Sequence, residues 1–130
     1  MPSRLARLKR RQDFLRIART GRKWAAPGLV LQCAPRPGSD EDGAPETAPR
    51  VGFTASRKVG GAVDRNRARR RLRAVSEAVL ATAARPDRDF VLIARAGTLT
   101  RPFPLLIQDL ETGLDRVGGR DGGAVAAAAR

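Results

Sequence analysis

One segment limits the architecture of this chain more than any other: residues 59–84, where arginines and small apolar side chains are interleaved. On a helix of about 100° per residue, Ala68, Leu72, Val75 and Val79 fall within roughly 60° of one another and form a narrow apolar stripe. Six arginines lie off that stripe: Arg65, Arg67, Arg69, Arg70, Arg71 and Arg73. The pattern predicts a helix over 63–84 that docks on a sheet by one face and presents guanidinium groups elsewhere.

So many like charges on one helix require an explanation, because neighbours three and four residues apart repel. An anionic partner would remove this repulsion, and the planar arginine fork binds phosphate in a bidentate manner and stacks on bases. The alternative is pairing within the chain, where Arg67 or Arg70 would contact Asp64 or Glu77. The turn at Gly60–Gly61 adds backbone N–H groups at the helix start, where phosphate also binds.

The net charge of +13 is concentrated rather than spread over the 130 residues. Residues 1–23 hold nine basic residues against one acid, and residues 50–73 hold the same balance. Residues 24–49 are acidic, and residues 74–130 are neutral. Such clustering is expected of a protein that neutralises phosphates, although a bias toward arginine in the genome would account for part of the composition.

The residues that are absent exclude several kinds of catalysis. The chain has no His, no Tyr and one Cys, Cys33, so Cys/His zinc sites and histidine-activated nucleophiles are excluded. A single cysteine cannot form an internal disulfide, which fits a reducing compartment. No uncharged stretch reaches the roughly 18 residues of a membrane span. We therefore expect a cytoplasmic polyanion-binding protein without a membrane anchor or an obligate protein partner.

The remaining periodicity predicts a small α+β fold, a two-layer sandwich in the order α-β-β-(β)-α-β-α, with helices packed on one mixed sheet. It predicts strands over 29–33, 50–57 and 90–94 and helices over 8–19 and 102–117. The segment 38–48 is rich in Pro, Gly and acids and predicts a long loop. We expect one RNA-binding domain over 1–117 and a disordered Gly/Ala-rich tail over 118–130.

The segment from Arg50 to Arg73 resembles the signature of the bacterial ribonuclease P protein subunit, including the Arg-Asn-Arg sequence at 65–67. The resemblance covers about residues 5 to 115. Gly61 stands where the family usually has Asn, and Arg57 and Arg69 stand where lysine is common. Residues 38–46 look like an insertion, and Ala18 occupies a place where some members have a second aromatic residue.

The resemblance implies a subunit that binds a large catalytic RNA and assists Mg²⁺-dependent endonucleolytic removal of the 5′ leader from precursor tRNA. It also implies an unusual left-handed βαβ crossover. The RNA and its Mg²⁺ ions would perform the chemistry, so no protein residue is expected to be catalytic or to ligate a metal. The residues expected to contact the RNA subunit are Gly60, Arg65, Asn66, Arg67, Arg69, Arg70 and Arg73.

By the same resemblance, the leader strand would lie in a cleft between the first helix and the sheet. The residues expected to contact it are Phe14, Ser56, Arg57, Lys58 and Arg95. Phe14 either packs in the core, stacks on an unpaired base, or does both with different ring faces, and Arg95 alternatively caps a strand. Trp24 and Phe53 are expected to pack, Cys33 to be buried, and the acids Asp109, Glu111 and Asp115 to be solvated.

Two other functions fit parts of the sequence. A ribosomal or general RNA-binding protein would share the basic helix but would not distinguish precursor from mature tRNA. A self-sufficient nuclease would need a metal-binding pair such as Asp87 and Asp89, for which no third ligand is near in sequence.

Overall fold

The computed structural model describes residues 5–37 and 48–121. The elements are β1 (Ala6–Arg7), α1 (Arg11–Thr20), β2 (Arg22–Ala25), β3 (Leu29–Pro35), β4 (Arg50–Thr54), α2 (Ala62–Ala83), β5 (Arg88–Ala94), the 3-10 helix η1 (Ala96–Leu99) and α3 (Phe103–Arg116). They form one sheet in the order β1-β4-β5-β3-β2. In the described part of the chain, no helix is long and apolar enough to cross a membrane.

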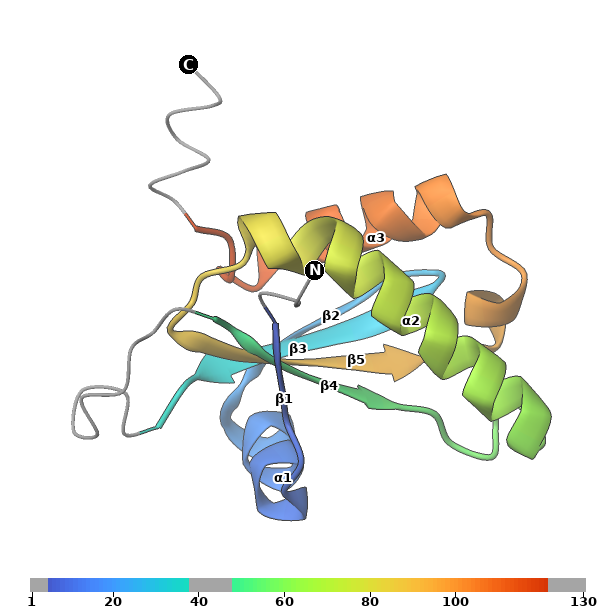
Figure 1. The fold of residues 1–130 in the computed structure, drawn as a ribbon, viewed down its shortest axis with the longest axis horizontal. Helices are drawn as coiled ribbons and strands as arrows, with labels where there is room; N and C mark the ends of the chain where they lie inside the picture. Colours follow the sequence, from blue (N-terminus) through green and yellow to red (C-terminus); the bar gives the residue numbers. More distant parts are fainter. Residues whose placement is uncertain (1–4, 38–47, 122–130) are drawn as a thin grey trace.

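The sheet is mixed. Strands β1, β4 and β5 run parallel to one another, β3 is antiparallel to β5, and β2 is antiparallel to β3. Helices α2 and α3 cover one face, and α1 crosses the opposite face (Figure 1). The predicted α+β class is confirmed. The sheet forms one layer, and α2 and α3 together form the second. Helix α1 adds a partial cover on the other side.

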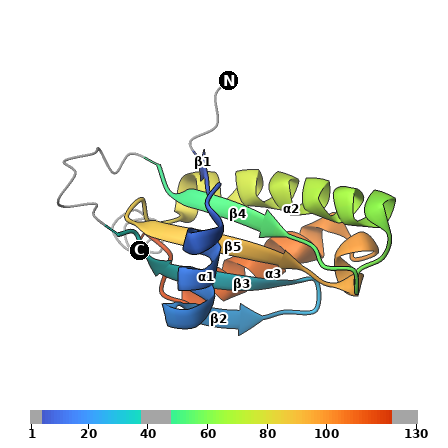
Figure 2. The same ribbon diagram turned by 90° about the horizontal axis from the view of Figure 1, so that it is seen from below.

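The crossover from β4 through α2 to β5 is left-handed. These strands are parallel neighbours, and Figure 2, seen from the α1 side, shows both running from left to right with β5 below β4 and α2 behind the sheet. Because about 98% of such connections are right-handed, general rules predict the opposite arrangement. The expectation that came from the family resemblance is confirmed.

The apolar stripe of α2 lies where the periodicity places it. Ala68, Leu72 and Val75 are fully buried and Val79 is almost so. They pack in one core with Phe90 of β5 and with the buried face of α3, whose members are Leu106, Leu110 and Leu114. The stripe is thus the surface that holds α2 on the sheet, and the rest of the helix is left to solvent or a partner.

The ends of several elements differ from the prediction. The first helix begins at Arg11 rather than at residue 8, because residues 6–8 pair with β4; the Leu8 amide donates to the carbonyl of Val51 at 3.0 Å. Strand β4 ends at Thr54, so residues 55–57, which were predicted to continue the strand, lie outside it. The predicted ranges did not include β1, β2 or η1, although the predicted order allowed the third strand that the structure has between α1 and α2.

The predicted boundary of the tail is also wrong. Residues 118–121 belong to the folded unit: the Arg85 amide donates to the carbonyl of Gly119 at 2.7 Å, and Gly119 packs against the ring of Phe90. The Arg120 guanidinium pairs with Asp115. The rest of the predicted tail, 122–130, and most of the acidic loop, 38–47, lie outside the described residues.

Candidate nucleic-acid interface

Five arginines of α2 form a face without an ion pair to any acid that the structure describes. We define the arginine face as Arg65, Arg67, Arg69, Arg70 and Arg73. Arg67, Arg70 and Arg73 are exposed, and among the described residues no carboxylate forms an ion pair with Arg65, Arg67, Arg69 or Arg70. The intramolecular pairing that the sequence left open is therefore not found for Arg67 and Arg70.

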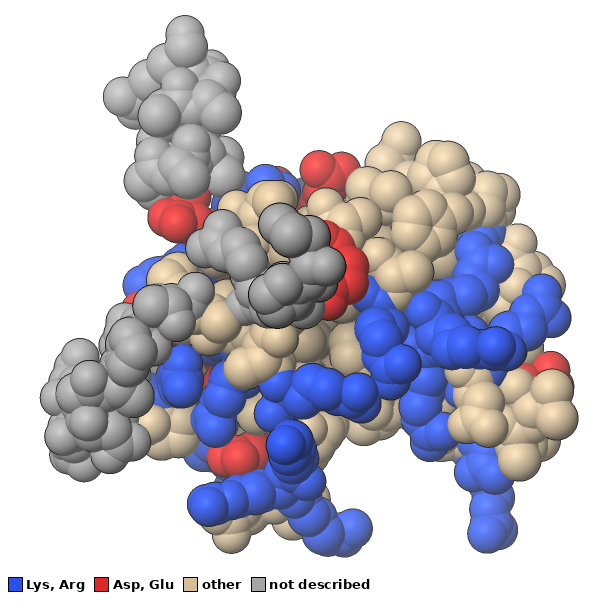
Figure 3. Space-filling view, viewed as in Figure 1, with Lys and Arg blue, Asp and Glu red and all other residues tan. Residues whose placement is uncertain are grey.

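A shallow hollow of about 470 Å³ lies on the arginine face, lined by Val63, Asn66, Arg69, Arg70 and Arg73. The Arg69 Nη1 donates to Asn66 Oδ1 at 3.1 Å, so the amide holds one guanidinium in place on the helix surface. Figure 3 shows Lys and Arg side chains gathered over α2 and around α1, with few acidic side chains between them on this face. An RNA backbone is the kind of ligand that such a field attracts.

Two arginines of the helix have a structural role as well. Arg71 donates from Nη1 to the carbonyl of Leu99 at 3.3 Å and from Nη2 to the carbonyl of Arg101, so its side chain fastens α2 to the η1–α3 turn. The Arg73 guanidinium lies 5.8 Å from the centre of the Phe53 ring, within the range of a cation–π contact. Phe53 itself packs against the core, as predicted.

At the start of α2, Gly60 has a φ of +151°, a conformation that side chains other than glycine rarely adopt. A Cβ at this position would collide with the carboxylate of Asp64, which lies over Gly60 in the first turn of the helix. This carboxylate interacts favourably with the positive end of the helix dipole. It also places a negative charge beside the amides that the sequence suggested for phosphate.

The residues Ser56, Arg57 and Lys58 form an exposed turn between β4 and α2. The turn is stabilised by the Ser56 side chain, whose Oγ accepts from the Lys58 amide at 3.3 Å. Arg95 follows β5 at the same end of the sheet, since β4 and β5 are parallel neighbours. One arm of Arg95 is engaged, because Nη1 donates to the carbonyl of Ala26 at 2.8 Å.

Phe14 belongs to the other face of the sheet. Its ring packs on the backbone of β4 at Gly52, where a Cβ would overlap the ring, and it joins the small cluster around Ile17. The ring is half-buried and also borders an open hollow of about 350 Å³, which we call the α1 hollow. Both interpretations of Phe14 are therefore compatible with its position, one ring surface for packing and one accessible to a ligand.

The α1 hollow includes residues that the sequence reasoning missed. Its lining consists of Lys9, Arg11, Phe14, Leu15 and Thr54. Leu15 is 53% exposed and adds apolar surface beside the Phe14 ring. Arg11 lies three residues before Phe14 on the same face of α1, so helical spacing could have identified it. The hollow thus combines two cations with apolar side chains.

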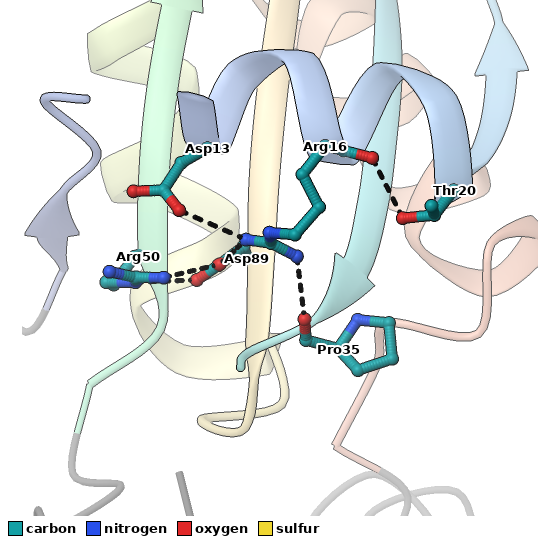
Figure 4. Close-up of polar contacts among 6 residues, drawn as sticks. All are labelled: Asp13, Arg16, Thr20, Pro35, Arg50 and Asp89. Atoms are coloured by element: carbon teal, nitrogen blue, oxygen red, sulfur yellow. Dashed lines mark hydrogen bonds and ion pairs between the residues drawn. The ribbon is translucent and has the colours of Figure 1, made fainter. Parts of the chain in front are cut away.

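Asp89 holds α1, β4 and β5 together. Its side chain is fully buried and accepts from Arg50 at 2.7 and 2.6 Å and from Arg16 Nη2 at 2.5 Å (Figure 4). The Arg16 Nη1 donates to the carbonyl of Pro35 at 3.0 Å, and Asp13 lies 3.6 Å from Arg16 Nη2. The hydrogen bond to Asp89 raises the pKa of Arg50 above its ordinary value.

These contacts disfavour the nuclease that the sequence suggested from Asp87 and Asp89. Asp87 accepts from Arg85 at 3.0 and 3.2 Å and lies 3.3 Å from Arg88. Both carboxylates are already neutralised by arginines, and a metal ion would have to displace them. In the described ranges 5–37 and 48–121, no three side chains of the metal-ligating types converge.

One prediction about the last helix is wrong. Asp109 is buried rather than solvated, and its carboxylate accepts from Arg101 at 2.6 and 3.0 Å and from the amide of Gly28 at 3.1 Å. Glu111 and Asp115 are exposed as expected. Asp109 thus fixes the η1–α3 turn against the β2–β3 turn, which is far away in sequence.

Comparison with known proteins identifies the family of the chain. The profile of the ribonuclease P family matches residues 2–118. The chain is 54% identical over 118 residues to the ribonuclease P protein component of Paramagnetospirillum magneticum, covering 91% of this chain and 86% of the relative. It is 45% identical over 120 residues to that of Gluconacetobacter diazotrophicus, covering 92% and 97%.

Solved structures show the same fold. The RNase P protein of Staphylococcus aureus superimposes with a TM-score of 0.62 at 24% identity, covering 84% of this chain and 92% of that one. The RNase P protein from Thermotoga maritima gives a TM-score of 0.64 at 23% identity, covering 82% and 92%. On the family profile and the two sequence relatives, we conclude that this chain belongs to the ribonuclease P protein family.

Proposed function

We propose that the chain binds the catalytic RNA of ribonuclease P through the arginine face of α2 and binds the 5′ leader of precursor tRNA along α1. The observation that carries this proposal is the set of exposed arginines that no carboxylate in the described part of the chain neutralises. The buried stripe fixes α2 on the sheet, so these arginines present several guanidinium groups to the phosphates of a folded RNA.

The α1 hollow is the proposed site of the leader strand. Phe14 offers a ring surface, while Lys9 and Arg11 offer cations for the backbone. Stacking platforms combined with a basic groove are typical of single-strand binding. Ser56, Arg57, Lys58 and Arg95 lie at one end of the sheet, where they would contact phosphates of the leader as it leaves this hollow.

The chain is not proposed to perform the chemistry. Asp87, Asp89 and Asp109 accept hydrogen bonds from arginines, so these carboxylates do not fit a resident Mg²⁺ site. The proposed division of labour leaves Mg²⁺ to the RNA, in the cytoplasm, and gives the protein the tasks of binding and orienting two RNA partners.

Reconstitution with the cognate RNA tests this function. The holoenzyme should cleave precursor tRNA at the 5′ end of the mature sequence at low Mg²⁺, and it should bind leader-bearing precursor more tightly than mature tRNA. The protein without its RNA should not cleave. Equal affinity of the holoenzyme for the two tRNAs would support a general RNA-binding protein, and cleavage by the protein alone would support a protein nuclease.

A further inference from the structure

A second hollow lies between α2 and the start of α3, on the side of the helix away from the sheet edge. Its volume is about 550 Å³, within the roughly 300–1,000 Å³ of small-molecule sites. One wall consists of residues at i, i+3, i+4 and i+7 of α2, and the other of residues 100–103. The lining residues are Arg67, Arg70, Arg71, Ala74, Thr100, Arg101, Pro102 and Phe103.

Phe103 is the apolar element of this α2–α3 hollow. It is the first residue of α3, stands between Pro102 and Pro104, and is 37% exposed. The two prolines restrict the backbone on both sides, so the main chain that carries the ring is constrained before any ligand binds. In Figure 3 the basic side chains of α2 border a surface without charged groups over the first turns of α3.

The floor of the hollow is rigid. Arg71 is fixed by two backbone carbonyls of the η1–α3 turn, and Arg101 is held by two hydrogen bonds to the buried Asp109. Neither guanidinium is free to move toward Phe103 and cover its ring. The hollow is therefore preformed, which lowers the entropic cost of binding a ligand.

The remaining cations are available. Arg67 and Arg70 are exposed, and in the described part of the chain they form no ion pair or hydrogen bond. Ala74, one turn further along α2, is small and leaves the space above the floor open. An accessible aromatic ring flanked by two unneutralised guanidinium groups has the chemistry of a site for one unpaired nucleotide.

We propose that the α2–α3 hollow binds an unpaired nucleotide of the catalytic RNA, with its base stacked on Phe103 and its phosphate beside Arg67 and Arg70. This inference rests on the proposed function and deepens it, since it adds contact with a base to a face that is otherwise proposed to contact only phosphates. The nucleotide belongs to the catalytic RNA rather than to the leader, because residues of α1 line the α1 hollow and α1 lies on the opposite face of the sheet (Figure 1).

The test is the equilibrium assembly of the full chain with the cognate RNA, measured over a series of salt concentrations. Phe103→Leu keeps the apolar bulk and removes the aromatic ring; it should weaken assembly by about 5- to 150-fold, which corresponds to the ~1–3 kcal/mol of stacking one base. Because no charge is lost, the dependence on salt should not change. Phe103→Trp should assemble within about threefold of the wild-type protein.

Three further variants complete the design. Arg67→Ala should weaken assembly and also flatten the salt dependence by about 0.7–0.9 in log–log slope, and combined with Phe103→Leu it should cost less than the product of the single effects. Gln108→Ala, an exposed residue of α3 outside the hollow, is the matched control and should not alter assembly.

Several results would overturn the inference. They are wild-type assembly of Phe103→Leu, equal losses for the Leu and Trp variants, or a loss confined to the binding of precursor tRNA. A wild-type protein that does not bind the RNA would instead refute the proposed function, so the two failures are distinguishable.

Discussion

Asp89 shows how a single buried carboxylate can organise a basic protein. It accepts three hydrogen bonds from two arginines that belong to different elements, and one of these arginines also reaches the end of β3. Helix α1 contributes only Ile17 as a buried side chain, so the apolar contact that fixes it is small. The position of the α1 hollow therefore depends on Asp89.

We predict that Asp89→Asn lowers the free energy of unfolding by about 2–4 kcal/mol, because Arg16 and Arg50 lose their counter-charge. This is somewhat less than the loss for a fully buried pair, since both arginines keep about a quarter of their side chains exposed. Urea unfolding measures the change. Glu111→Gln, which alters an exposed acid, is the control and should stay within about 0.5 kcal/mol of the wild type.

Cys33 gives a prediction about pH. Burial raises the pKa of its thiol from 9.0 to about 11, against the opposing effect of nearby arginines. The native state thus retains a proton that the unfolded state loses between pH 9 and 11, and stability must fall as pH rises through this window. The loss is about 2–3 kcal/mol.

The chain has no Tyr, so no phenol titrates in the same range, and a variant without the thiol isolates the contribution of Cys33. Cys33→Ala should start from a lower stability, owing to the lost packing, but should not show this fall between pH 9 and 11. Chemical unfolding at a series of pH values compares the two proteins. Parallel profiles would show that the thiol is not responsible.

At the scale of the element, α2 is a core helix that also carries the proposed binding surface. Its stripe needs only small and medium apolar residues every three or four positions, which leaves most of its circumference for arginine. We predict that replacing Arg65 and Arg67 together with Ala weakens assembly with the cognate RNA. The log–log salt dependence should flatten by about 0.7–0.9 for each lost phosphate contact.

An unchanged salt dependence in that double variant would mean that both arginines remain in solvent in the complex. Thr82→Ala, an exposed position on α2 in a part of the helix without arginines, serves as the control. It should leave both the affinity for the RNA and its salt dependence unchanged.

The elements that sequence predicted correctly are those with long, regular patterns. Helices α2 and α3 and strand β5 lie within a few residues of the predictions, because their apolar residues repeat over two or more turns or form a continuous run. The ranges of strands β1 and β2 were not predicted, because strands of two and four residues at the sheet edges are too short to show a periodic pattern. Pairing with strands that are distant in sequence defines them.

The same distinction applies to the candidate site. The arginine face follows directly from helical spacing, so its residues could be named before the structure was known. The burial of Asp109 could not be predicted from the sequence, because it depends on Arg101 and on the amide of Gly28, which is 81 residues away in the chain. The hollow beside Phe103 likewise requires knowing that α3 begins next to the middle of α2.

At the scale of the whole molecule, the sheet separates two basic surfaces. Helix α1 and its hollow lie on one face, and the arginine face belongs to the other side (Figures 1 and 2). Since α1 and α2 lie on opposite faces of the sheet, we expect changes in the two surfaces to have separate effects.

We predict that Phe14→Ala lowers the affinity of the holoenzyme for leader-bearing precursor tRNA by about 5- to 150-fold, through loss of one stacked base. Its assembly with the catalytic RNA should not change. Phe14→Leu, which retains packing against Gly52, separates stacking from folding and should show a similar loss. An equal loss for leaderless tRNA would contradict the stacking role.

The placement of the two surfaces on either side of the sheet has a consequence for the order of assembly. Under the proposed function, the catalytic RNA and the leader bind opposite faces and do not compete sterically, so either one can bind first and neither has to leave before the other arrives. We then expect the protein itself to contribute little coupling free energy between the binding of precursor tRNA and the binding of the catalytic RNA. Any cooperativity between the two would arise from contacts between the RNAs.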